Sequence, residues 1–164
     1  MKIIISLIVG AILGIAALQL PQVQQVIGKS LAPQMLLEIE SPLDFYDTLD
    51  KLVENAKAEG WKVPKKWRVN FQRNLEKVTG EDIGPNEVIK MCEPFAAVKM
   101  LKHDKYKLLT AMMPCTIAVY EKSDGKTYIS MMNMNMLGLM YGGELAEIAS
   151  ELAPQMSKMV DLSK

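Results

Sequence analysis

Two cysteines and their neighbouring methionines are the side chains most able to do chemistry in this sequence. Cys92 follows Met91, and Cys115 follows the pair Met112 and Met113. Thiolate and thioether sulfur are the ligands that Cu(I) prefers. The candidate soft-metal set therefore consists of Cys92, Cys115, Met91 and Met113. The same two cysteines are also a candidate disulfide, or two separate buried thiols, and the sequence alone leaves these alternatives open.

A second concentration of sulfur lies in the stretch MMNMNMLGLM, residues 131–140, which holds five of the thirteen methionines. Methionine also fills irregular gaps in hydrophobic cores. If the stretch continues as a strand, alternation sends Met132 and Met134 to one face and Met131 to the other. Because one metal ion cannot use both faces, we interpret this stretch as core rather than as a copper site.

Catalytic signatures are absent from the sequence. His103 is the only histidine, and its charged neighbours predict an exposed position near a helix end. There is no paired-histidine or C-x-x-C zinc motif, no phosphate-binding glycine loop and no G-x-S-x-G elbow. A lone histidine gives poor support to triad-type catalysis. We therefore expect a protein that is not an enzyme, and no cofactor can be named.

The amino terminus predicts the location of the protein. Residues 3–20, IIISLIVGAILGIAALQL, carry no charge and are long enough to cross a bilayer as a helix. A cleaved secretory signal is the alternative. Lys2 precedes the segment and only Lys29 soon follows it, which places the remainder of the chain outside the cytoplasm. Residues 21–34 are interpreted as a linker and residues 35–164 as the folded domain.

Periodicity and turn residues predict an α+β domain that follows this single membrane helix. The predicted strands are residues 35–40, 61–63, 87–92, 115–121 and 127–133. The predicted helices run from Pro42 to Gly60, with Ser41 as N-cap, from Phe71 to Gly80, from Pro94 to His103, and from Leu145 to Val160. Residues 122–126 contain Asp-Gly, which is typical of a hairpin. Helices between strands and a tight hairpin favour an antiparallel or mixed sheet with helices on one face.

Three strings give the sequence a family resemblance: MCEPFAAVKML, MMPCTIAVYEKSDGKTYISMMN and MYGGELAEI. From Glu38 to Val160 the chain resembles the domain of unknown function 302 family. The matching positions are Cys92 and Pro94, then Pro114 and Cys115, then Tyr120, Glu121, Asp124 and Gly125.

The resemblance implies a small fold with a curved, mostly antiparallel sheet, often found in secreted or membrane-tethered proteins, and no established activity. It also implies that the two cysteines lie near one another. Glu93 stands where family members often have Asn, so a ligand that needs that amide would bind differently here. The implied ligand-binding residues are Cys92, Glu93, Pro94, Pro114, Cys115, Tyr120 and Glu121.

The balance of charges limits the classes of partner that can be expected. Nineteen basic and nineteen acidic residues give a net charge of zero, so no phosphate backbone is expected as partner. The leading hypothesis is a membrane-anchored, periplasmic, non-enzymatic domain that binds a small ligand or a membrane-protein partner, including as an accessory subunit of a membrane complex. The alternative is a soft-metal or thiol redox protein that uses Cys92 and Cys115.

Overall fold

The structure is a computed structural model that describes residue 25 and residues 29–163. The expected membrane segment, residues 3–20, lies outside the described residues, as does half of the expected linker, residues 21–34. In the part of the chain that is described, no helix combines the length and the hydrophobicity needed to span a bilayer. The chain divides after Met35, and the domain that carries the candidate site begins at Leu36.

The domain is built on one five-stranded sheet in which every neighbouring pair is antiparallel. Its strands are β1 (Leu36–Glu40), β2 (Arg68–Asn70), β3 (Asn86–Met91), β4 (Cys115–Glu121) and β5 (Thr127–Met132). Their order across the sheet is β1-β5-β4-β3-β2. The first strand therefore pairs with the last, which ties the start of the domain to the far end of the β4–β5 hairpin. The predicted α+β class is confirmed, and the sheet is antiparallel rather than mixed.

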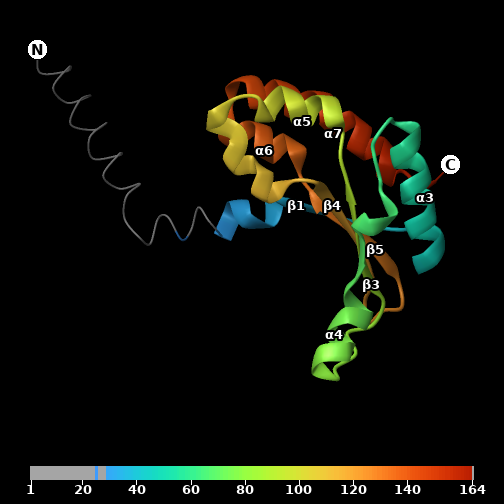
Figure 1. The fold of residues 1–164 in the computed structure, drawn as a ribbon. Helices are drawn as coiled ribbons and strands as arrows, with labels where there is room; N and C mark the ends of the chain where they lie inside the picture. The colour runs from blue at the N-terminus through green and yellow to red at the C-terminus, as the bar shows by residue number, and fades with distance from the viewer. Residues whose placement is uncertain (1–24, 26–28, 164) are drawn as a thin grey trace, which may run out of the picture. The chain divides into compact units, whose positions relative to one another are not determined.

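The α-helices are α3 (Phe45–Ala58), α4 (Phe71–Thr79), α5 (Pro94–Leu101), α6 (Met134–Tyr141) and α7 (Gly143–Val160). Helices α3, α5, α6 and α7 cover one face of the sheet, whereas α4 lies at one end of it (Figure 1). The 3-10 helices are η1 (Ala32–Gln34), η2 (Lys65–Trp67) and η3 (Asp104–Met112). Helix α7 contacts both α3 and α5: the Asn55 amide donates to the Met159 carbonyl at 3.0 Å, and Lys99 Nζ lies 3.0 Å from Glu151.

Along β3, β4 and β5, buried residues alternate with more exposed ones, which gives the sheet a core face and an outer face. Ile89 and Met91 of β3 and Ile117 of β4 are fully buried under the helices. The intervening residues point to the outer face, and because paired residues of antiparallel strands share a face, they form rows across the sheet. These rows include Lys90 with Thr116, Ala118 with Ser130, and Leu36 with Met132.

The methionine-rich stretch is not a strand beyond Met132, which corrects the expectation for Met134. Asn133 ends the β-structure and caps α6, since its side-chain oxygen accepts from the backbone N–H groups of Asn135 and Met136. Met134 and Met136 are buried on this helix. Three of the five methionines are therefore core, as predicted, although a change from strand to helix buries Met134 and Met136, and Met140 is exposed.

Other local expectations also require correction. Helix α3 begins at Phe45 rather than at Pro42, because Asp44 is its N-cap and accepts from the Asp47 N–H at 2.9 Å. The Ser41 hydroxyl instead contacts the Thr48 hydroxyl inside the domain at 2.6 Å. The expected strand at residues 61–63 is only an isolated bridge between Lys62 and Cys92. Strand β2 and helix η3 were not predicted.

Candidate functional site

The two cysteines lie at the same end of neighbouring strands. Cys115 is the first residue of β4 and is paired with Met91, the last residue of β3. Cys92 follows immediately and exchanges two backbone hydrogen bonds with Lys62, at 2.9 and 3.0 Å. Both cysteines are half-buried and both are free thiols, so the disulfide that the sequence allowed is not present in the structure. The structure nevertheless brings them together, because both line one small cavity.

This cavity, which we call the cysteine void, has a volume of about 20 Å³. It is lined by Trp61, Cys92, Glu93, Ala96, Ala97, Met100, Met113, Pro114, Cys115 and Leu152. Of the two methionines predicted to accompany the cysteines, Met113 lines the void and Met91 does not. Met91 is fully buried in the core, and Met100 of α5 supplies the second thioether at the void. Sequence reasoning missed Met100 because it lies two helical turns beyond Cys92 and far from Cys115 along the chain.

The surroundings of the cysteines keep both thiols protonated at neutral pH. Burial raises the pKa of the Cys115 thiol to about 11, and the nearby Cys92 adds to this effect. Burial also raises the pKa of the Cys92 thiol, and the Glu93 carboxylate raises it further. Since the thiolate is the nucleophile, neither cysteine is activated for attack on a substrate. This environment gives no support to nucleophilic catalysis by either thiol.

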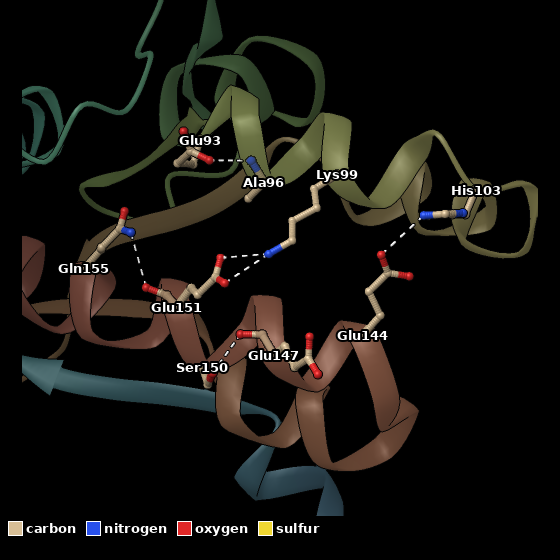
Figure 2. A network of polar contacts seen from close by, with 9 residues as sticks. All are labelled: Glu93, Ala96, Lys99, His103, Glu144, Glu147, Ser150, Glu151 and Gln155. Atoms are coloured by element: carbon tan, nitrogen blue, oxygen red, sulfur yellow. Dashed lines mark hydrogen bonds and ion pairs between the residues drawn. The ribbon is translucent and has the colours of Figure 1, made fainter.

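Glu93 and Pro94 begin helix α5. The Glu93 carboxylate accepts hydrogen bonds from the backbone N–H groups of Phe95 and Ala96, which makes it the N-cap, and Pro94 occupies the first helical position (Figure 2). Glu93, at the position where the resemblance implies Asn, therefore has a structural role in this chain. A carboxylate also places a negative charge beside the Cys92 thiol, which an amide would not.

Replacing Glu93 by glutamine separates its role as N-cap of α5 from the effect of its charge on the Cys92 thiol. The amide keeps an oxygen that can accept from the α5 N–H groups, but it removes the charge, so the pKa of Cys92 should fall toward its ordinary value. The thiolate fraction at slightly alkaline pH then rises, and alkylation by iodoacetamide should be faster in a Cys115→Ser background, where Cys92 is the only thiol. Glu147→Gln is the matched control on α7. Equal alkylation rates with and without the Glu93→Gln substitution would show that the charge has no influence.

Polar contacts hold α5 in place over α7. Figure 2 shows Lys99 reaching from α5 to Glu151, and His103 pointing to Glu144 at the start of α7, with 3.3 Å between His103 Nε2 and Glu144 Oε1. His103 follows the end of α5 and is partly exposed, close to its predicted position. Because α5 carries Met100 and the cap at Glu93, these contacts fix one wall of the cysteine void.

A second cavity lies on the outer face of the sheet, where the segment after η3 passes the ends of β3, β4 and β5. We call it the sheet-face pocket, and its volume is about 300 Å³. It is lined by Leu36, Lys90, Ala111, Met112, Met113, Pro114, Cys115, Thr116, Ala118, Ser130, Met131 and Met132. Three residues, Met113, Pro114 and Cys115, also line the cysteine void, so this segment forms the wall between the two cavities.

Lys90 is the only charged residue, within the described part of the chain, that lines the sheet-face pocket. It is half-buried, and among residues 29–163 it forms no ion pair. Thr116 is the partner of Lys90 in the sheet register, Ser130 lines the same pocket from β5, and the remaining walls are apolar. Sequence reasoning did not identify Lys90, because its neighbours in the pocket come from strands that only the register brings together.

Three of the implied ligand residues, Pro94, Tyr120 and Glu121, line neither cavity. The Tyr120 hydroxyl donates to the Glu38 carboxylate, and its ring stacks on Tyr128 with 6.2 Å between centroids. Lys122 Nζ lies 2.6 Å from the same Glu38 carboxylate. These contacts join β1 to the β4–β5 hairpin, so Tyr120 stabilises the sheet edge. The implied residues that do surround the cysteine void are Cys92, Glu93, Pro114 and Cys115.

The fold and the two cavities define the class of protein. It is a small α+β domain whose single antiparallel sheet carries helices on one face and a pocket on the other. The family model for the domain of unknown function DUF302 matches residues 37–163, which is most of the chain. The chain therefore belongs to the DUF302 family, and the resemblance seen in its motifs is confirmed.

A solved structure supports the same assignment. The crystal structure of an uncharacterized conserved DUF302 protein from Bacillus stearothermophilus is similar, with a TM-score of 0.67 and 26% sequence identity. The alignment covers 77% of this chain and 96% of that chain. No protein with a curated description matches the chain.

Proposed function

We propose that this protein is a membrane-anchored, extracytoplasmic, non-enzymatic domain that binds a small organic anion in the sheet-face pocket. The observation that carries the proposal is Lys90, a half-buried cation that has no ion-pair partner among residues 29–163 and lies in an otherwise uncharged pocket. Ligand sites are typically apolar cavities of roughly 300 to 1,000 Å³ with a few polar groups that fix orientation. The sheet-face pocket has this character and lies at the small end of the range.

The lining determines which ligand fits. Met112, Met113 and Met132 offer flexible thioether side chains that adapt to an apolar body. Lys90 favours an anionic head, and no acidic residue of the described chain lines the pocket to oppose it. Thr116 lies next to Lys90 in the sheet register, and its hydroxyl, which donates to the Pro114 carbonyl at 3.4 Å, can donate to the same head after rotation. A short carboxylate with an aliphatic tail meets these requirements, whereas a cation or a fully polar molecule does not.

The proposed location depends on the uncharged run at residues 3–20 and on the basic Lys2 before it. An anchor of this kind holds the domain at the membrane surface, where it meets ligands and membrane-protein partners at raised local concentration. A role as an accessory subunit of a membrane complex is compatible with such an anchor. A phosphatase reporter fused to the carboxyl end should be active in the periplasm, and activity only of a cytosolic reporter would remove the location from the proposal.

Binding of three matched probes tests the pocket: hexanoate, hexanol and hexylamine, which share a tail and differ in charge. We expect hexanoate to shift the amide NMR signals of Lys90, Thr116 and Ser130. It should bind about 10-fold more tightly than hexanol, which is the gain in affinity that one charge-assisted hydrogen bond provides. Hexylamine should not bind. Lys90→Met should abolish the preference for the anion and leave the weak affinity for the tail.

Lys77→Met is the control, because it makes the same change on the exposed surface of α4. It should leave all three affinities unchanged. If hexylamine and hexanoate perturb the pocket signals equally, or if Lys90→Met and Lys77→Met behave alike, the anion site is wrong.

A further inference from the structure

The cysteine void has a chemistry different from that of the sheet-face pocket. Four of its lining residues carry sulfur: Cys92, Cys115, Met100 and Met113. They come from four separate places, namely the residue after β3, the start of β4, the last turn of α5 and the residue after η3. The other walls include Trp61, Ala96 and Leu152, all buried and apolar.

We propose that the cysteine void is a binding site for a single Cu(I) ion, held by the thiolates of Cys92 and Cys115 and by the thioethers of Met100 and Met113. Soft sulfur ligands select Cu(I). This inference rests on sulfur donors rather than on Lys90, although Met113 and Cys115 line both the cysteine void and the sheet-face pocket.

The size of the void fits an ion rather than an organic molecule. About 20 Å³ is close to the volume that one water-sized probe occupies. A bare monovalent ion fits such a space, and the apolar walls leave no room for a hydration shell. Cys92 is half-buried rather than fully enclosed, so the ion has an entry path beside the first turn of α5.

The donor set also argues against other metals. Zinc and the harder divalent ions require imidazole, carboxylate or several thiolates. Within residues 29–163, no three side chains of the His, Cys, Asp and Glu types come together as such a group. Glu93 lines the void, but its carboxylate is occupied by the backbone N–H groups of α5. Sulfur is therefore the only available donor type among the described residues at this position.

The binding reaction balances without an oxidant. Cu(I) keeps its oxidation state, forms one bond to each of the two thiol sulfurs, and displaces both thiol protons to solvent. The thioethers contribute neutral donors and release nothing. Two thiolates and one Cu(I) leave a single net negative charge on the copper–thiolate group.

Anaerobic titration of the full chain in detergent, against a chromogenic Cu(I) chelator as competitor, tests the site. We expect one Cu(I) per chain. Cys92→Ser and Cys115→Ser should each weaken binding by more than ~100-fold, because loss of a direct ligand exceeds the loss from an outer-shell partner. Met100→Leu and Met113→Leu conserve side-chain volume and remain folded, and each should weaken binding by about 10-fold.

Met156→Leu is the matched control, because Met156 is buried in α7 and does not line the void. It should bind Cu(I) as the parent protein does. X-ray absorption of the copper-loaded protein should show sulfur scatterers alone. Three results would overturn the assignment: no stoichiometric binding, full affinity in the Cys92→Ser and Cys115→Ser proteins, or equal losses in Met100→Leu and Met156→Leu. Equally tight retention of Zn²⁺ would overturn the preference for Cu(I).

Discussion

Replacing Trp61 by alanine is expected to lower the free energy of unfolding by about 3 to 5 kcal/mol, the usual cost of truncating a buried aromatic residue. Trp61 is only 2% exposed, although it stands between a helix and a single bridge residue. Its indole N–H donates to Gln155 Oε1 on α7 at 2.8 Å. The substitution therefore opens a cavity and also leaves the Gln155 amide oxygen without this donor.

The structural reason for so large an effect is that Trp61 joins parts of the chain that are far apart in sequence. Its backbone N–H bonds to the Ala56 carbonyl of α3, and its ring lines the cysteine void beside α5 and α7. Domains of this kind are stable by only about 5 to 15 kcal/mol. A loss of this size is a large fraction of the total, and it also removes one wall of the proposed copper site.

Trp67→Ala is the matched control, since it makes the same chemical change in η2, where the side chain is only half-buried. We expect a loss of about 1 kcal/mol there. Urea denaturation followed by far-UV circular dichroism measures both, because each variant loses one of the two tryptophans that fluorescence would report. Equal losses at the two positions would mean that Trp61 does not have the packing role described.

Local signals in the sequence are sufficient for the β4–β5 hairpin. The predicted strand 115–121 matches β4 residue for residue, because alternating apolar residues are bounded by proline on one side and a turn on the other. In the turn, Gly125 has a φ of +74°, which favours glycine, and the Asp124 carboxylate accepts from the Lys126 N–H at 3.0 Å. These turn interactions are between near neighbours, so the sequence displays them directly.

Two kinds of feature could not be predicted, for different physical reasons. The start of α6 had a signal in Asn133, a good N-cap, but the preceding alternation and the adaptability of methionine favoured a longer strand. The sheet-face pocket had no local signal. Lys90 and Ser130 are brought to one cavity only because β3 and β5 flank β4 in a fixed register. Register depends on long-range pairing, which a single sequence does not reveal.

The basic cluster at residues 65–68 shows the same limit. A group of basic residues such as Lys65, Lys66 and Arg68 is usually part of a solvated loop and can also be an anion site, yet Arg68 already has acidic partners. Its Nε donates to Glu87 of β3, and its terminal nitrogen lies 3.6 Å from Asp50 Oδ1 of α3. Strand β2 is short, and this ion pair fixes it against β3. Both partners are distant in sequence, so neither the strand nor the pairing could be predicted.

This ion pair supports the second large effect, which is the expected result of replacing Arg68 by methionine. Glu87 is 7% exposed and points to the core face between Ile89 and the turn that precedes β3. Without Arg68, a buried carboxylate loses its counter-charge, and the free energy of unfolding should fall by about 3 kcal/mol. Removing Glu87 instead leaves a partly exposed Arg68 that water and Asp50 still satisfy, so Glu87→Leu should cost less.

The double variant Arg68→Met with Glu87→Leu distinguishes a buried pair from an ordinary loss of contacts. Replacing both charges by apolar side chains removes the desolvation penalty together with the attraction, and such exchanges are often neutral. We therefore expect the double variant to be more stable than Arg68→Met alone, as measured by urea denaturation of all four proteins in one cycle. If the two losses simply add, Glu87 is not held by Arg68, and β2 must owe its place in the sheet to its backbone hydrogen bonds alone.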